Sequence, residues 1–263
     1  MEDSSFHVTL PSNSRSNYKN TASSFRITLP RRLELSGQWE VGVSEVFIPI
    51  THYNLGNSDE KGRQILFQLH WAGKINLIGV TISAGNYPTI EKLIAEINRE
   101  LANILKEPYS CKFFVDEVTR HTLIETSKTA EFLLIYLGRE LAYILGFPLT
   151  TADIHFSNYK AVSQHPCDIS ANLNEVYIYS DLIRTQFVGN SEVKLLRIVS
   201  IRGGGSFGEV VHRIFERPQF HALASNSILE VQVELRTAAG APFPIRLGNT
   251  IIQLTFRRRG LRL

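Results

Sequence analysis

The segment SIRGGGSFGEVVHR, residues 200–213, fits two glycine-rich patterns that occur at catalytic sites. One is the kinase loop G-x-G-x-x-G-x-V, which covers ATP phosphates and here takes in Gly203, Gly205, Gly208 and Val210. The other is the hydrolase elbow G-x-S-x-G, which presents a nucleophilic serine and here takes in Gly204, Ser206 and Gly208. The first would support phosphoryl transfer, and the second would support attack on a carbonyl carbon by Ser206.

The residues that follow this segment fit neither reaction. A kinase loop is followed by a lysine strand, a catalytic loop and a metal-binding aspartate, but the chain from Glu209 onward contains no lysine. A hydrolase elbow leads into a helix, whereas GEVVHRIFER alternates like a strand. We therefore expect a flexible hairpin loop between two paired strands, formed by Gly203, Gly204, Gly205, Ser206 and Gly208.

No other cluster of reactive side chains has the spacing of a catalytic or metal site. The eight histidines form no H-E-x-x-H motif, and Cys111 and Cys167 are far apart with no C-x-x-C spacing. Glu40 and Glu45 point to opposite faces of a regular strand, so they cannot form a same-face carboxylate pair. Whether other carboxylates form a catalytic pair depends on the fold, and the sequence leaves that alternative open. We expect free thiols in a reducing compartment, no enzymatic activity, no catalytic residue, no cofactor and no metal.

The charge of the chain is concentrated at its C-terminus. The 263 residues carry a formal net charge of +3, and the last seven include Arg257, Arg258, Arg259 and Arg262. Because the rest is nearly neutral, a nucleic-acid surface over the whole body is excluded, and attraction to phosphate is expected only at a basic tail, residues 257–263. The first ten residues are not a secretory signal and no apolar run is long enough to span a bilayer, so we expect no membrane contact.

Hydrophobic residues recur mostly with a period of two, which is typical of strands. FHVTL and FRITL are examples, and about a dozen such segments are separated by Gly, Asn, Pro and Ser. Helical spacing occurs only in YPTIEKLIAEINRELANILKEP and in the shorter GRELAYILGFP, each with a proline beyond its end. The pattern predicts one all-β domain over residues 1–263, a sandwich or closed barrel interrupted by one longer and one shorter helix.

The N-terminal stretch from Leu10 to Leu55 carries a more specific pattern. Its members are Tyr18, Asn20, Thr21, Phe25, Leu29, Pro30, Leu33, Leu35, Gly37, Trp39, Glu40, Val41, Gly42, Glu45, Pro49, Tyr53 and Asn54. With LGFP, VYIYSDLIRTQFVGNSEVKLLRIV and PFPIRLGNTIIQLTFRR in matching order, it resembles the penton-type minor capsid proteins of Maverick/Polinton elements and the related adintoviruses.

This resemblance implies a single jelly-roll β-sandwich that acts as a structural protein of a virion. Proteins of that family are thought to assemble as homopentamers that close the fivefold vertices of an icosahedral capsid, beside a double-jelly-roll major capsid protein. It further implies synthesis in the host cytoplasm, with assembly in the nucleus or cytoplasm. If the C-terminal arginines face the shell interior, they would make weak contact with packaged nucleic acid.

A different class of function shares the same strand pattern. A carbohydrate- or protein-binding jelly-roll module outside any capsid would need exposed aromatic side chains on loops, for which the candidates are Tyr87, Phe147, Tyr159 and Phe207.

The shared residues also have structural interpretations. Gly37 is expected to form the turn before the Trp39 strand, and Trp39 to anchor the core, where its truncation would cost about 3–5 kcal/mol. Asn20 and Thr21 are expected to bind nearby backbone groups in a turn. Maintenance of the fold is therefore the expected role of most of the motif.

Overall fold

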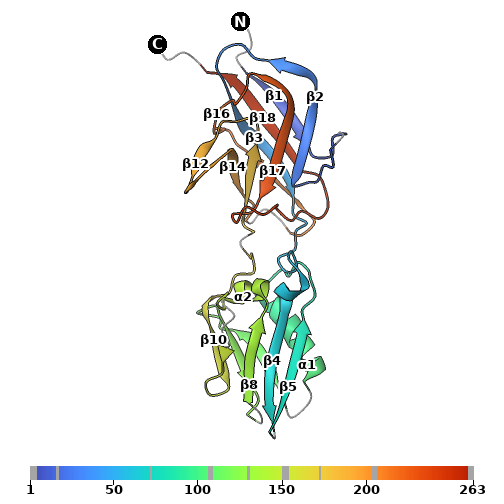
Figure 1. Cartoon of the computed structure of the whole chain (residues 1–263), viewed down its shortest axis with the longest axis vertical. Coiled ribbons are helices and arrows are strands. Elements are labelled where there is room, and N and C mark those ends of the chain that lie inside the picture. The colour runs from blue at the N-terminus through green and yellow to red at the C-terminus, as the bar shows by residue number, and fades with distance from the viewer. Residues whose placement is uncertain are drawn as a thin grey trace. The chain divides into compact units, whose positions relative to one another are not determined.

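A computed structural model describes residues 5–15, 18–71, 73–105, 109–128, 131–149, 154–171, 173–202 and 206–259. It divides the chain into two compact units (Figure 1). The sandwich unit comprises residues 1–52 and 172–263, and the inserted unit comprises residues 53–171.

Two antiparallel sheets build the sandwich unit. The first has the order β1 (Ser5–Pro11), β18 (Ile251–Arg258), β3 (Trp39–Pro49) and β15 (Val210–Ile214), with β16 (His221–Ala222) also paired to β3. The second has the order β14 (Leu195–Ser200), β11 (Glu175–Ser180), β17 (Ser227–Arg236) and β2 (Ser24–Glu34).

The order of these strands defines the topology. Counted along the chain from one to eight, the strands of the first sheet read 1-8-3-6 and those of the second read 5-4-7-2. This is the arrangement of an eight-stranded jelly roll, in which consecutive strands mostly lie in opposite sheets. The predicted all-β jelly roll is confirmed.

Alternation along the strands explains why the two sheets stack. Phe25 and Ile27 of β2 are buried between the sheets, whereas the alternating residues Arg26 and Thr28 face outward. Val41 and Val43 of β3 are fully buried in the same core. Apolar residues at every second position thus turn one face of each sheet toward the other.

The inserted unit has its own core, two sheets and both helices. Its sheets have the orders β5 (Lys74–Thr81), β4 (Gln64–Trp71), β8 (Glu131–Leu137), β9 (Ile154–His155), and β10 (Lys160–Pro166), β7 (His121–Thr126), β6 (Cys111–Val115). Its helical elements are η1 (Glu60–Arg63), α1 (Ile90–Ile104) and α2 (Arg139–Leu145).

Both predicted helices are present within the predicted segments. The Thr89 side chain accepts a hydrogen bond from the backbone N of Lys92, which caps the start of α1. α2 ends at Gly146, whose φ of +77° is left-handed. A side chain there would meet the His165 carbonyl at 2.0 Å, so the position requires glycine.

The division of the packing into two cores was not indicated by the sequence pattern. The strands expected between residues 63 and 137 exist, but they build the inserted unit and not the jelly roll. A single domain over residues 1–263 stays a prediction.

Candidate functional site

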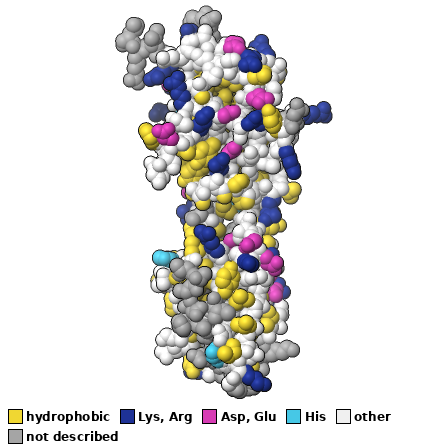
Figure 2. Space-filling model, in the orientation of Figure 1, with side chains coloured by type: hydrophobic (Ala, Val, Ile, Leu, Met, Phe, Trp, Pro, Cys, Tyr) yellow, Lys and Arg dark blue, Asp and Glu magenta, His cyan; other side chains and the backbone are white. Residues whose placement is uncertain are grey.

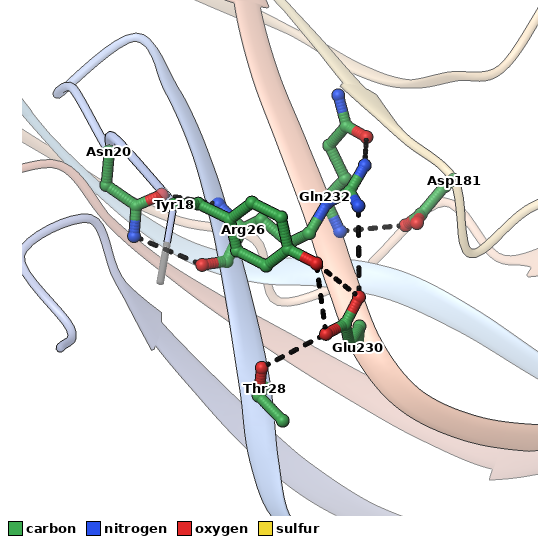
Figure 3. Close-up of polar contacts among 7 residues, drawn as sticks. All are labelled: Tyr18, Asn20, Arg26, Thr28, Asp181, Glu230 and Gln232. Atoms are coloured by element: carbon green, nitrogen blue, oxygen red, sulfur yellow. Dashed lines mark hydrogen bonds and ion pairs between the residues drawn. The ribbon is translucent and has the colours of Figure 1, made fainter. Parts of the chain in front are cut away.

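The N-terminal motif residues fix the chain that enters β2. The side-chain Oδ1 of Asn20 accepts a hydrogen bond from the backbone N of Arg26 at 2.9 Å, and its Nδ2 donates to the backbone O of Arg26 at 3.1 Å. Thr21 Oγ1 accepts from the backbone N of Ser24 at 3.0 Å and donates to the Ser24 carbonyl at 3.2 Å. As expected, both residues bind local backbone groups, and Figure 3 shows how Asn20 holds the segment before β2 beside Arg26 of the strand.

On the outer face of the second sheet of the sandwich unit, Tyr18 and Arg26 belong to a polar network across β2 and β17. The Tyr18 hydroxyl donates to Glu230 at 3.2 Å, and the Arg26 guanidinium lies 4.7 Å from the centre of the Tyr18 ring. Arg26 also donates to Gln232 Oε1 at 2.5 Å and lies 3.8 Å from the Glu230 carboxylate. Figure 3 shows these side chains converging on Glu230.

The network borders two hollows that share Asp181. Asp181 Oδ1 accepts a hydrogen bond from the backbone N of Gln232 at 2.9 Å, and desolvation by its surroundings raises the pKa of its carboxyl. One hollow, of about 490 Å³, is lined by Tyr179, Ser180, Asp181, Thr185, Glu192, Val193, Lys194, Gln232, Glu234, Arg236 and Gly240. The other, of about 380 Å³, runs from Asp181 past Ser227 to Glu230. Their linings offer charged groups, hydroxyls and amides that could bind a polar ligand.

Gly37 and Trp39 lie at the start of β3. Gly37 has a φ of +90° directly before the strand, in line with the expected turn. The position of Trp39 corrects the expectation of a core anchor: it is only partly buried. Its ring packs 5.5 Å from Phe6, and its Nε1 donates to the Ser36 carbonyl at 3.0 Å. A strand's first residue lies at the end of the sandwich, where the core cannot surround a side chain completely.

The expected basic tail starts within strand β18. Arg257 and Arg258 belong to β18, so the tail does not begin at residue 257. The Glu40 carboxylate lies 3.0 Å from Arg257 and 3.7 Å from Arg259, and Arg257 also stacks on Phe220 at 3.6 Å. Arg262 lies outside the described residues. Contact between these arginines and nucleic acid stays a prediction.

The remaining motif residues are Glu45, Tyr53 and Asn54, and each makes its own local contacts. Glu45 Oε1 is 2.5 Å from His212 Nε2, and the His212 ring stacks on Phe47 at 4.2 Å. Tyr53 and Asn54 belong to the inserted unit, where Asn54 binds the backbone N and O of Tyr87 at 2.9 and 2.8 Å. The structure therefore gathers the motif into local supports of the fold and not into one site.

The glycine-rich segment connects the two sheets. Gly203, Gly204 and Gly205 lie outside the described residues. The backbone N of Ser206 donates to Glu209 Oε2 at 2.7 Å, and that of Gly208 donates to the Ile50 carbonyl at 2.7 Å. The strand expected after Ser206 is β15, so the hydrolase elbow lacks its helix.

The expected hairpin at this segment is wrong. β14 pairs with β11 in one sheet, and β15 pairs with β3 in the other, so the two flanking strands are not partners. The topology places β14 and β15 in different sheets, and a local strand-turn-strand pattern cannot distinguish such a connection from a hairpin.

The aromatic residues considered for ligand binding differ in exposure. Phe147 is buried, and Tyr87 is partly buried with its hydroxyl donating to the Ser83 carbonyl at 2.7 Å. Tyr159, in the inserted unit, and Phe207, in the sandwich unit, are exposed. Phe147 is therefore removed from the candidates.

The cysteines of the chain carry no disulfide and are poorly reactive. Both cysteines are free; burial raises the pKa of the Cys111 thiol to about 12 and also raises that of Cys167. No group of three or more His, Cys, Asp or Glu side chains suited to a metal ion occurs among the described residues. In the same part of the chain, no helix has the length and apolar character needed to cross a bilayer.

Sequence reasoning missed the most exposed aromatic side chain of the sandwich unit. Phe187 lies on a short hairpin of β12 (Gln186–Val188) and β13 (Ser191–Val193) and is 82% exposed. The Gly189-Asn190 pair that closes this hairpin was the available signal. Asp181, Glu230 and Gln232 carried no comparable signal, because their contacts join distant parts of the chain.

Comparisons with known proteins identify a shared fold. No protein-family model matches the sequence, and no curated protein matches it. Among solved structures, the crystal structure of the SeMet-labelled mavirus penton protein matches with a TM-score of 0.53 and 11% identity, covering 97% of this chain and 99% of that one. The flagellar cap protein FliD D2-D3 domains from Escherichia coli reach a TM-score of only 0.18, too low to indicate a common fold.

The chain is thus a jelly-roll protein with an inserted helical and β unit, and its fold is that of a penton-type capsid protein. A solved protein that displays this fold is the mavirus penton protein.

Proposed function

We propose that this chain is the penton subunit of an icosahedral capsid, a structural protein that assembles as a homopentamer at the fivefold vertices. The observation that carries the proposal is the match to the mavirus penton protein over almost the full length of both chains. The match includes the inserted unit, so it is more specific than the sandwich alone, which occurs in many unrelated proteins.

The jelly roll suits a ring of identical subunits. Closed cyclic symmetry above twofold requires each subunit to present two different, complementary surfaces. Each sheet of the sandwich ends in two edge strands, β1 and β15 in the first and β2 and β14 in the second. These edges provide different surfaces to two neighbours.

The proposal places the protein in the virion, next to a double-jelly-roll major capsid protein. It gives the chain a structural and non-enzymatic role, with synthesis in the host cytoplasm and assembly in the nucleus or cytoplasm. The arginines at the end of β18 would reach packaged nucleic acid only if that end of the sandwich faces the interior. Because Glu40 pairs with Arg257 and Arg259, any such contact would be weak.

The test is the mass and shape of the purified protein. Native mass spectrometry and light scattering are expected to give a mass five times that of the 29.7 kDa chain, and negative-stain images are expected to show five-membered rings. A strictly monomeric protein at the highest soluble concentration, or a ring with a different number of subunits, would contradict the proposal.

The hollow of about 490 Å³ beside Asp181 favours a second candidate function, which is binding of a carbohydrate or a peptide outside a capsid. Its lining combines an aromatic ring with carboxylates, an amide and a lysine, and these polar groups could form hydrogen bonds with a hydroxyl-rich ligand. A glycan array tests this candidate. Specific binding that is lost in Gln232→Ala, by a protein that stays monomeric, would favour it over the penton role.

A further inference from the structure

One edge of strand β17 is open over half of its length. On one side β17 pairs with β11 only through residues 233–236, and on the other it pairs with β2 over residues 227–234, with one irregularity. Residues 227–232 therefore have no partner strand on the β11 side within the described part of the chain. Six strand residues span about 20 Å, and an unpaired edge of this kind readily accepts another extended segment.

The backbone groups of Glu230 and Gln232 face this open edge. The backbone N of Leu235 donates to the Ser23 carbonyl, so Leu235 faces β2, as do the residues two and four positions before it. Gln232 faces the other way, and its backbone N donates to Asp181 Oδ1 at 2.9 Å (Figure 3). Residues two apart in a strand offer their N–H and C=O groups to the same edge, so those of Glu230 also face the open side. The Asp181 side chain fills one position of this edge, and the next position, at Glu230, is open.

The smaller hollow, of about 380 Å³, lies along this open edge. Its apolar lining includes Ile228 and Leu229 of β17 and Leu182. Its charged members, Asp181 and Glu230, are both acidic. Figure 2 shows acidic and basic side chains interspersed over the visible face of the sandwich unit, so a lining with only acidic charges is a local property of this hollow. The hollow therefore suits an extended segment that carries apolar and cationic side chains.

Asp181 is the carboxylate that a cation in this hollow would meet. Glu230 already accepts a hydrogen bond from the Tyr18 hydroxyl and lies 3.8 Å from Arg26. Asp181 is exposed, and it has no ion-pair partner among the residues that the structure describes. An arginine in the hollow would therefore find one carboxylate that no other cation neutralises directly.

The C-terminal segment of the chain begins close to this hollow. The backbone N of Arg259, the last described residue, donates to the Gln38 carbonyl at 2.9 Å. On the opposite side of the same stretch, the backbone N of Leu223 donates to the Trp39 carbonyl at 3.2 Å. Arg259 and Leu223 are thus separated by about two strand spacings, or about 10 Å. The residue after Leu223 is Ala224, which lines the hollow.

We propose that residues 260–263 of the same chain occupy the smaller hollow as a short strand beside β17, with Arg262 paired to Asp181. These residues lie outside the described part of the chain, and their sequence, Gly-Leu-Arg-Leu, alternates apolar and basic side chains. Four extended residues span about 14 Å, which is enough to enter the hollow from Arg259. Docking of this kind would hold Arg262 on the chain and away from nucleic acid. The inference goes beyond the penton role and does not depend on it.

Hydrogen exchange at two neighbouring amides tests the docking. A chain shortened to end at Arg259 keeps β18 complete, so it should fold with a melting temperature near that of the wild type. The Glu230 N–H should exchange at least tenfold faster in the shortened chain than in the full chain, because the tail no longer accepts its hydrogen bond. The matched control is the Val231 N–H, which faces β2 and should exchange equally in both chains. Arg262→Glu in the full chain should also speed exchange at Glu230.

A labelled peptide of residues 257–263 tests the role of Asp181. In fluorescence anisotropy it should bind the shortened chain saturably, and bind the full chain at least tenfold more weakly because the hollow is occupied. In the shortened chain, Asp181→Asn should weaken binding at least threefold, since it removes the charge but keeps an acceptor for the Gln232 backbone N. Glu192→Gln is the matched control, because Glu192 lines only the larger of the two hollows, and it should leave the affinity unchanged.

Three results would overturn the proposal. Equal exchange of the Glu230 N–H in the full and shortened chains would mean that the tail does not pair with β17. Equal affinity of the peptide for both chains would mean that the tail leaves the hollow empty. Slower Glu230 exchange in isotope-labelled shortened chain after mixing with unlabelled full chain would mean that the tail docks on a second copy. None of these results bears on the penton role, which depends on the mass of the assembled protein.

Discussion

Asn20 binds both backbone groups of Arg26, accepting from its N at 2.9 Å and donating to its O at 3.1 Å. Asn54 binds Tyr87 in the same way, and so does Asn98 with Phe113, at 2.7 and 2.8 Å. In each case an amide side chain supplies the two hydrogen bonds that a neighbouring strand would supply. Segments outside regular pairing are thereby held at defined positions beside strands or turns.

Asn20→Ala is expected to destabilise the sandwich unit by about 1–3 kcal/mol, because it leaves the N and O of Arg26 without these partners. The Tyr18 side chain would also lose its fixed place beside Glu230. Chemical denaturation followed by circular dichroism measures the effect. The matched control is Asn76→Ala, since Asn76 is exposed on β5 and makes no side-chain hydrogen bond in the described structure. Equal losses of unfolding free energy in the two variants would contradict the role of Asn20 in holding the segment before β2 in place.

Trp39→Ala is expected to cost about 2 kcal/mol, less than a fully buried aromatic residue would cost. Trp39 is partly buried, whereas Phe25 is 2% exposed within the core, so Phe25→Ala should cost about 3–5 kcal/mol. Trp39→Phe should recover most of the loss, because a ring would still pack on Phe6. Denaturation curves compare the three variants. A larger loss of unfolding free energy for Trp39→Ala than for Phe25→Ala would contradict this order and support Trp39 as the anchor of the core.

The two thiols are expected to differ in reactivity. Cys111 is 4% exposed with a pKa of about 12, whereas Cys167 is only partly buried. Because the thiolate is the reactive form, DTNB at pH 8 should modify Cys167 slowly and Cys111 only after unfolding in guanidinium chloride. Cys167→Ser should therefore show almost no reaction while folded. A rapid reaction of that variant would mean that the core around Cys111 opens readily.

The local patterns predicted the elements well because each depends on neighbouring residues. Alternation in FRITL and helical spacing from Ile90 to Leu101 follow directly from which side chains must reach a core. The stop of α2 at Gly146 likewise depends on one residue's backbone freedom. Such signals are complete within about 20 residues, so no knowledge of the tertiary structure is needed to interpret them.

Pairings over long distances could not be predicted in the same way. Tyr18 and Glu230 are 212 positions apart, and nothing near either residue specifies the other. The flanks of the glycine-rich segment alternate like strands and so predict a hairpin, but their partners, β11 and β3, are set by the topology. The separate core of the inserted unit was missed for the same reason, since its strands have the same local pattern as those of the jelly roll.

Acid is expected to destabilise the protein partly through His52. Its ring packs edge-on against Phe243 at 5.2 Å, its buried Nδ1 has no hydrogen-bond partner among the described residues, and burial lowers its pKa. Below a pH of about 6.5 the unfolded chain therefore binds a proton that the folded chain excludes, so stability falls as the pH decreases, by at most about 1.4 kcal/mol per pH unit. His52→Phe should remove this contribution and narrow the difference in unfolding free energy between pH 7.5 and pH 5.5. His7→Gln, at an exposed position on β1, should keep the wild-type difference. Identical pH profiles for the wild type and His52→Phe would show that His52 is protonated as easily in the folded chain as in the unfolded one.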